Sequence, residues 1–336
     1  MKKFNIYSIF CSCICVLFLT SPLSAASEAS GKQKVEKPKK KVFISQVVDH
    51  PALNATARGI VDALAAAGYK KNENLDLRIE SAQAQLPLSA QIASRFMSQK
   101  PDVVVAIGTL SAQSFAKQAR AGEVKLIFSS VTDPLGAKLV RSLEKPEYNT
   151  SGVSNFVELK PQLSLFKEIQ PKLLKVGVLY SSGELNSVSV VHKLEAEATA
   201  LGLQLIKQTA SRTADVAQAA SKLAQQVGAI FISNDNTALS GFQSVVRAAQ
   251  QAHIPVYVSD SDAVELGAVA ALGPNQYAIG LQTGRMVVRV LEGADVNREA
   301  VEFPEKTELY LNPKAAQKAD LSFSKELLNR ATKVLL

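Results

Sequence analysis

Two stretches of the chain alternate short apolar runs with segments of helical spacing, and this alternation limits the possible folds more than any other feature. The first series begins at Val42 and the second at Lys175. Gly68 and Gly202 each close the first helix of their series, so the two series overlay at an offset of 134 residues. Near-continuous apolar strands separated by helices are typical of parallel sheets covered on both faces. We therefore predict an α/β protein with two doubly wound parallel-sheet lobes rather than one large sheet.

The last part of the chain does not simply extend either lobe. A strand at 269–272 precedes a helix at 279–291, a strand at 307–311 follows, and Ala331 is expected in a final helix. If the helix at 279–291 returns to the first lobe, the chain crosses between the lobes three times, near 152–156, 273–276 and 309–312. Three short crossings form a hinge, and hinge closure around a ligand is a known domain motion. The first lobe then comprises 42–154 plus 275–308, and the second 155–274 plus 309–336.

Residues 1–26 have the pattern of a secretory signal peptide. Two lysines precede an apolar run at 6–19, and small residues at 24–26 predict cleavage before Ser27. The run is shorter than the ~20 residues that a membrane-spanning helix needs, so an uncleaved anchor is the less favoured alternative. Cys13 lies too near the N-terminus for a lipoprotein signal. We predict a periplasmic protein without a lipid anchor.

The lysines that make the chain basic are concentrated near its N-terminus. Residues 27–41 hold six lysines against two glutamates, and without this segment and the leader the net charge falls from +8 to about +2. We interpret 27–41 as a Lys-rich, solvated spacer, with a basic arm attracted to a surface as the alternative. Binding of nucleic acid is not expected, because no basic stripe is visible on a folded face.

Enzymatic chemistry has little support in the sequence. The phosphate-binding, zinc-protease and nucleophile-elbow motifs are all absent. All three cysteines lie inside the leader, which excludes disulfides and thiol catalysis from the mature chain. The three histidines are not spaced for a metal site. We expect no enzyme, no cofactor and no metal, and an exported enzyme is the weakest alternative.

Short polar residues follow the predicted strands of both lobes. In open parallel sheets, ligands bind in the crevice beyond the carboxyl ends of the strands. Each of these loops could instead only cap the helix that follows it. Because both lobes direct such loops toward one cleft, we predict that they bind a ligand together. The candidate ligand-binding residues are His50, Thr109, Leu110, Ser111, Thr132, Asp133, Tyr180, Asn186, Ser187, Asp235, Asn236 and Asp260.

These side chains suit a small zwitterion such as an amino acid. Backbone N–H groups from Thr109 to Ser111 open a helix and suit a carboxylate. The carboxylates of Asp133, Asp235 and Asp260 suit an ammonium group. The loops contain no lysine or arginine, which disfavours a polyphosphate. Tyr180 is a candidate apolar or aromatic wall.

Several segments carry a resemblance to a known family. They are His50-Pro51-Ala52-Leu53, Ala106-Ile107-Gly108-Thr109, Val131-Thr132-Asp133-Pro134, Asn149-Thr150-Ser151-Gly152-Val153, Val176-Gly177-Val178-Leu179-Tyr180, Glu184-Leu185-Asn186-Ser187 and Asn234-Asp235-Asn236-Thr237. In this order they resemble the ABC-transporter substrate-binding proteins that include tryptophan- and tyrosine-binding lipoproteins. Leu110 stands where the family often has proline, Asn234 where many members have threonine, and 81–85 departs from the usual Asn-Ala-Gln-Gly-Asp.

The resemblance implies a type I periplasmic-binding-protein fold with a hinge. It also implies that the protein delivers a small, amino-acid-like solute, such as an aromatic amino acid, to a membrane permease driven by a cytoplasmic ATPase. We expect a monomer that closes on its ligand. A ligand-sensing receptor of the same fold, which signals through a membrane partner instead of feeding transport, is the alternative. A sensor that reads DNA is excluded, because the leader and spacer cannot supply a helix-turn-helix.

Overall fold

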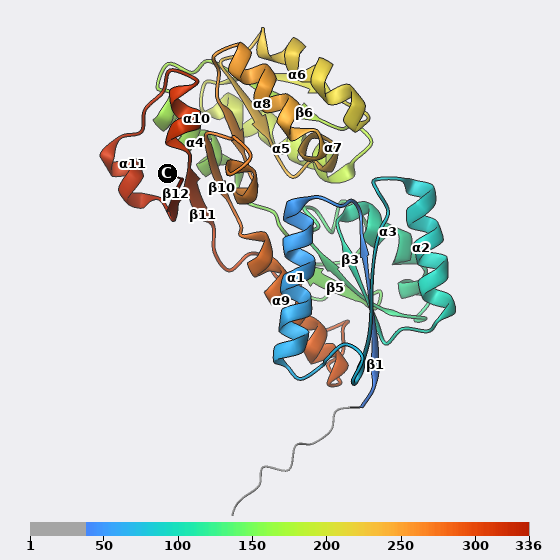
Figure 1. The fold of residues 1–336 in the computed structure, drawn as a ribbon. Helices are drawn as coiled ribbons and strands as arrows, with labels where there is room; N and C mark the ends of the chain where they lie inside the picture. The colour runs from blue at the N-terminus through green and yellow to red at the C-terminus, as the bar shows by residue number, and fades with distance from the viewer. Residues whose placement is uncertain (1–37, 336) are drawn as a thin grey trace, which may run out of the picture. The chain divides into compact units, whose positions relative to one another are not determined.

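The computed structural model describes residues 38–335, which form two α/β lobes (Figure 1). The first lobe is built on a five-stranded sheet in the order β2-β1-β3-β4-β5, and all its strands are parallel. The strands are β1 (Lys40–Gln46), β2 (Leu75–Ser81), β3 (Val103–Ile107), β4 (Lys125–Ser129) and β5 (Thr150–Val153). The helices of this lobe are α1 (Pro51–Ala66), α2 (Leu86–Ser98), α3 (Thr109–Arg120) and α9 (Gln276–Leu291).

The second lobe contains a seven-stranded sheet in the order β12-β11-β10-β9-β8-β6-β7. Its strands are β6 (Lys175–Tyr180), β7 (Gln204–Thr209), β8 (Ala229–Ile232), β9 (Val256–Val258), β10 (Ala270–Gly273), β11 (Glu308–Leu311) and β12 (Lys333–Val334). Its helical elements are α4 (Leu159–Ile169), α5 (Leu185–Ala200), η1 (Thr213–Asp215), α6 (Val216–Ala224), α7 (Asn236–Ser240), α8 (Phe242–Gln251), η2 (Ser261–Val264), α10 (Pro313–Gln317) and α11 (Lys325–Arg330). Only β11 runs antiparallel to its neighbour β10 within this described sheet.

Each sheet is covered by apolar side chains on both faces. In the first lobe α1 and α9 pack on one face and α2 and α3 on the other. In the second lobe α4, α5, α10 and α11 cover one face, and α6, α8 and η2 cover the other. Strands buried on both faces need near-continuous apolar sequence, which is the pattern that the two series display. The prediction of two doubly wound parallel-sheet lobes is therefore confirmed.

The chain passes between the two sheets three times. It leaves β5 for α4, leaves β10 for α9, and enters β11 after α9. Helix α9 lies beside α1 although the two are more than 200 residues apart in the chain (Figure 1). Glycines permit this close approach, because a Cβ on Gly280 would stand 2.1 Å from the Thr56 carbonyl oxygen. A Cβ on Gly59 would stand 2.3 Å from the Tyr277 carbonyl oxygen.

The structure contains elements that the pattern missed. The expected crossing near 152–156 begins only after strand β5, which extends the first sheet. Helix α4 contains Pro161 in its first turn, where the missing N–H of proline costs no helical hydrogen bond. The prediction that Ala331 lies in a final helix is wrong, because α11 ends at Arg330 and Ala331 has extended backbone.

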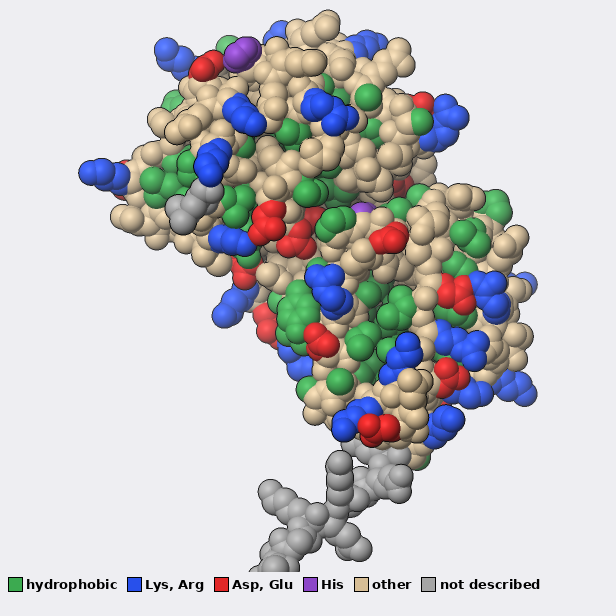
Figure 2. Space-filling view, viewed as in Figure 1, with side chains coloured by type: hydrophobic (Ala, Val, Ile, Leu, Met, Phe, Trp, Pro, Cys, Tyr) green, Lys and Arg blue, Asp and Glu red, His purple; other side chains and the backbone are tan. Residues whose placement is uncertain are grey.

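Two expectations concern the N-terminal part of the chain. The predicted signal peptide, and the predicted spacer up to residue 37, lie outside the described residues. The last two spacer residues, Lys40 and Lys41, already belong to β1. No helix among residues 38–335 is long and apolar enough to cross a membrane. On the face shown in Figure 2, lysines and arginines are scattered over both lobes, with acidic side chains among them.

Candidate functional site

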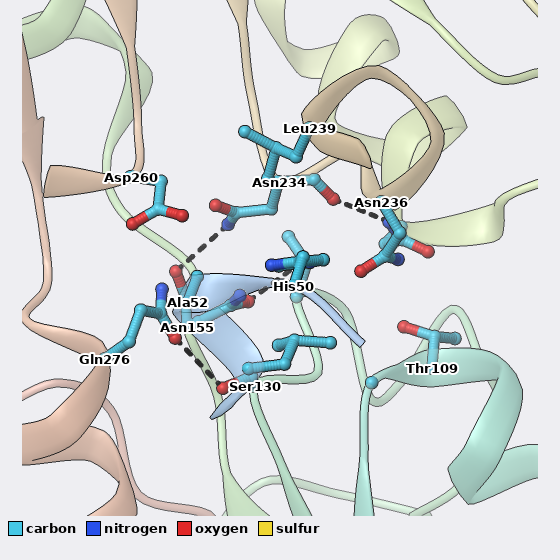
Figure 3. A pocket seen from close by; sticks show the side chains of 14 residues that line it. His50, Ala52, Thr109, Ser130, Asn155, Asn234, Asn236, Leu239, Asp260 and Gln276 are labelled. Atoms are coloured by element: carbon cyan, nitrogen blue, oxygen red, sulfur yellow. Dashed lines mark hydrogen bonds between the residues drawn. The ribbon is translucent and has the colours of Figure 1, made fainter. Parts of the chain in front are cut away.

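A cavity lies where the carboxyl ends of the strands of both lobes meet (Figure 3). The space between its lining side chains amounts to about 350 Å³, including the part open to solvent. We call it the inner chamber. Its lining residues are His50, Ala52, Leu53, Gly108, Thr109, Ser130, Thr132, Asn155, Asn186, Asn234, Asn236, Leu239, Asp260 and Gln276. The lining is predominantly polar, so the chamber is suited to a ligand that makes several hydrogen bonds.

Two helices of the first lobe begin at this chamber without a side-chain cap. His50 precedes α1, Gly108 precedes α3, and neither helix receives a capping hydrogen bond from a side chain. Gly108 has a φ of 88°, and a Cβ there would stand 2.6 Å from the Val47 side chain, so only glycine fits. The first N–H groups of a helix have no partner within it and carry a partial positive charge. Both helix ends therefore favour an anionic group of a ligand.

Two buried polar atoms of the lining have no hydrogen-bond partner. They are Nε2 of His50 and Oγ1 of Thr109, whose residues are 7% and 4% exposed. Burial lowers the pKa of His50, although a hydrogen bond with Asn236 and the charge of Glu184 act in the opposite direction. The imidazole is therefore neutral near pH 7. A buried polar group without a partner costs about 1–3 kcal/mol, so both atoms point to a ligand that would satisfy them.

Asp260 brings a carboxyl group into the chamber from the second lobe. One of its oxygens accepts a hydrogen bond of 3.1 Å from the Asp262 N–H. Within residues 38–335, no lysine or arginine forms an ion pair with it. Burial, and then the charge of Asp262, raise the pKa of Asp260 to about 7. A cationic group of a ligand would favour the charged carboxylate and supply the missing partner.

Glu184, at the start of α5, holds the amide side chains of the second lobe in place. Its carboxylate accepts from the Asn236 side chain at 2.6 Å and from the Thr237 hydroxyl at 2.7 Å. It also accepts from the Asn186 side chain at 3.2 Å. The Asn186 amide in turn donates to the Asn234 carbonyl oxygen at 2.7 Å. One partly buried acid therefore fixes two of the side chains that line the chamber, those of Asn186 and Asn236.

Six of the twelve candidate residues line the inner chamber. They are His50, Thr109, Thr132, Asn186, Asn236 and Asp260. Leu110 lines an adjoining cavity toward the mouth of the cleft, which Thr109, Asn186 and Asn236 also line. The structure thus brings together candidate residues from both lobes.

The other five candidates lie outside the inner chamber. Ser111 donates to the Ser45 carbonyl oxygen at 2.9 Å. Tyr180 packs against the core cluster that α4 and α5 cover, and the buried Ser187 hydroxyl accepts from the Asn186 amide at 3.3 Å. Their side chains contact neighbouring parts of the protein.

The two remaining candidates are carboxylates with other partners. Asp235 accepts 2.6 Å hydrogen bonds from the backbone N–H groups of Ser181 and Ala238, and so caps α7. Burial and the charge of Glu184 raise the pKa of Asp235 to about 7. Asp133 accepts a 2.6 Å hydrogen bond from the Ser189 hydroxyl, which belongs to the opposite lobe. Neither carboxylate lines the chamber.

Sequence reasoning did not select eight lining residues. They are Ala52, Leu53, Gly108, Ser130, Asn155, Asn234, Leu239 and Gln276. Asn155 and Gln276 stand at crossings between the lobes, so attention to the crossings would have found them. Ser130 has a positive φ of 53° directly after β4, which is a feature of the backbone rather than of the sequence. Among the residues that the structure describes, no cluster of acidic, histidine or cysteine side chains could hold a metal ion.

Two parallel-sheet lobes with three crossings and a polar chamber between them define a two-lobed protein that binds a small solute. The comparisons with known proteins agree with this class. The family model for ABC transporter substrate binding protein matches residues 41–335, so the chain belongs to that family. The family binds solutes and is not an enzyme family.

Three relatives illustrate the similarity. The chain is 33% identical over 297 residues to a tyrosine-binding protein of Clostridioides difficile, covering 88% of this chain and 86% of the relative. A conserved domain protein of Vibrio cholerae has a TM-score of 0.85 at 37% identity, with 88% of this chain and 100% of that chain covered. A domain from Streptococcus pneumoniae in complex with L-Trp has a TM-score of 0.83 at 32% identity, with the same coverage.

The TM-score is higher for the L-Trp complex than for an open relative. The ligand-free, open structure of a substrate-binding protein from Clostridium difficile gives a TM-score of only 0.67, although its identity is 34% over 88% of this chain and 99% of that chain. The L-Trp complex scores higher at almost the same identity. This chain is therefore more similar to the ligand-bound structure than to the ligand-free, open one.

Proposed function

We propose that the chain is the exported receptor of an ABC importer, which captures an amino acid in the inner chamber and delivers it to a membrane permease. The proposal rests on two groups that border the chamber from opposite lobes. One is the buried carboxyl group of Asp260 in the second lobe, which has no cationic partner, and the other is the uncapped start of α1 in the first lobe. One group suits an ammonium and the other a carboxylate. A ligand that carries both would hold the two lobes together.

Figure 3 supports α1 rather than α3 as the site of the carboxylate. Ala52, in the first turn of α1, lies on the same side of the chamber as Asp260 and Gln276, whereas Thr109 lies on the opposite side. The ammonium and carboxylate of an α-amino acid are attached to one carbon, so they must be bound close together. We therefore assign the carboxylate to the N–H groups at Ala52 and Leu53, and the ammonium to Asp260.

The relatives support an amino acid as the ligand. One is named a tyrosine-binding protein, and another was solved in complex with L-Trp. The other candidate residues fit the same proposal in two roles. His50, Thr132, Asn186 and Asn236 would contact the ligand, whereas Asp235, Ser111 and Ser187 would hold the loops in position.

The predicted signal peptide and the family together suggest where in the cell the protein acts and with which partner. A cleaved signal peptide at 1–26 would export the chain to the periplasm, where a monomer could meet its permease. The sensing receptor is not favoured, because the matched family serves transporters.

A thermal-shift screen of the chain from Ser27 against the common amino acids tests the proposal, with titration calorimetry for each ligand found. A ligand at 100 times its Kd should add about 2.7 kcal/mol of stability. Asp260→Asn should weaken binding at least thirtyfold, because loss of one partner of a buried charge pair costs about 2–5 kcal/mol. Asp215→Asn, which alters an exposed ion pair with Arg212, is the control. Absence of a shift with every amino acid, or unchanged binding by Asp260→Asn, would contradict the proposal.

A further inference from the structure

A second cavity continues the inner chamber toward the mouth of the cleft. We call it the outer chamber; it measures about 810 Å³, including the part open to solvent. Residues of both lobes line it, with Leu86 and Leu110 from the first and Glu184 and Leu185 from the second. Thr109, Asn186 and Asn236 line both chambers. The two chambers therefore adjoin at these three residues, which lie between the polar inner lining and the outer one.

Leucines from both lobes form an apolar collar around the outer chamber. Leu86 begins α2 of the first lobe and is 62% exposed, while Leu185 begins α5 of the second lobe and is 48% exposed. Leu110, in the first turn of α3, is the third member of the collar. Two such exposed leucines lining a single cavity leave apolar surface in water, which is costly unless a ligand covers it.

The two chambers differ in the chemistry that they offer. Four asparagines, a glutamine and a carboxyl group line the inner chamber, and the groups that suit an ammonium and a carboxylate lie on its far side from Thr109 (Figure 3). The outer chamber begins at Thr109, and its lining combines three leucines with polar side chains such as those of Gln113 and Glu184. A zwitterion anchored at Asp260 and Ala52 would direct its side chain past His50 toward this collar.

We propose that the collar of Leu86, Leu110 and Leu185 is the side-chain subsite of the receptor, and that it selects amino acids with long apolar side chains over small or polar ones. This inference rests on the proposed function. Because the collar takes leucines from both lobes, a side chain bound there would also bury surface of each lobe and so favour closure.

A homologous series of ligands measures the collar directly. Titration calorimetry would compare L-alanine, L-2-aminobutyrate, L-norvaline and L-norleucine, together with L-phenylalanine and L-tyrosine. In the wild-type chain, each added methylene should improve affinity about fourfold, the value expected for a buried CH₂ group. In Leu86→Ser and Leu185→Ser the gain should fall below twofold per methylene, while the affinity for L-alanine stays within twofold of wild type.

Leu174→Ser is the matched control, because Leu174 is 69% exposed but lines a separate groove of the second lobe. It should leave the series unchanged. Leu86, Leu185 and Leu174 are all exposed, so the three variants should keep the wild-type melting temperature. If the collar variants keep the wild-type gain in affinity per methylene, the proposal that the collar is the side-chain subsite is wrong, whereas the proposed function as an amino-acid receptor still stands. Failure of every amino acid to bind the wild-type chain would overturn the proposed function and the collar together.

Discussion

The hydrogen bond between Asp133 and Ser189 joins the two lobes outside the ligand chamber, and its loss should weaken ligand binding. The Ser189 hydroxyl, on α5, donates to Asp133 at 2.6 Å, and Gly136 donates its N–H to the other carboxylate oxygen at 2.9 Å. Lys193 lies nearby and places its ammonium 4.4 Å from the ring centroid of Phe156, in the first crossing. These contacts exist only when the lobes are close, so they stabilise the closed form selectively.

The size of the effect follows from the type of bond. A hydrogen bond to a charged group contributes about 1.5–3 kcal/mol, and the lower end applies here because both side chains are only partly buried. Ser189→Ala should therefore weaken ligand binding roughly tenfold. The change should appear mainly as faster dissociation, because the bond forms after the ligand has entered. The melting temperature of the unliganded chain should change little, since each lobe keeps its core.

The pH dependence supplies a second readout. Burial by itself would raise the pKa of Asp133, but the bonds from Ser189 and Gly136 and the charge of Lys193 together lower it below 3.8. A lowered pKa means that closure is strengthened above the ordinary pKa and loses this contribution as the pH falls through the lowered value. Wild-type affinity should therefore decline in acid, and Ser189→Ala should show a weaker decline.

The dissociation rate can be measured with a fluorescent label, because the chain has no cysteine of its own after Ser27 that would also react with the label. A cysteine introduced at the exposed Ser182 can carry a single fluorophore at the cleft mouth, and stopped-flow mixing then gives both rate constants. Ser221→Ala is the control, because the Ser221 hydroxyl donates only to the Ala217 carbonyl oxygen of its own helix. A dissociation rate for Ser189→Ala equal to that of the control would refute the reasoning.

Three further predictions concern stability. Thr109→Val removes a hydroxyl that is buried without a partner in the cleft between the closed lobes, so it should lower the cost of closure by about 1–3 kcal/mol and change the melting temperature of the unliganded chain little; Thr150→Val, which removes a bonded hydroxyl within the first lobe, should lower that melting temperature, and equal shifts would contradict this account. Asp260 has its pKa raised to about 7, so the folded chain binds this proton more tightly than the unfolded chain and loses stability as the pH rises from 4 to 7; Asp260→Asn should flatten that loss in pH-dependent thermal unfolding, and an unchanged slope would count against it. Gly280→Ala should destabilise the first lobe by roughly 1–3 kcal/mol in urea unfolding, because the new methyl group overpacks the contact with Thr56; a wild-type midpoint would show that the two helices can separate at little cost.

The sequence alone determined the architecture of this protein. Strand and helix periods are local properties, and the two series that begin at Val42 and Lys175 specify parallel sheets buried on both faces. The pattern predicted a helix at 279–291 but left open whether it returns to the first lobe, and its packing against α1 decided that. Helix α4 escaped prediction because its proline stands in the one turn that tolerates it. The short β5 escaped because four residues carry little periodicity.

The identity of the residues that face the ligand was decided only by the tertiary structure. Asp133, Asp235 and Asp260 each follow a strand and precede a turn or helix, so the sequence gives them the same interpretation. Packing separates them, because Asp235 receives two backbone N–H groups, Asp133 meets a serine of the other lobe, and Asp260 is left without a cation. Which partner a carboxylate finds depends on segments more than 50 residues away, and no local pattern records that distance.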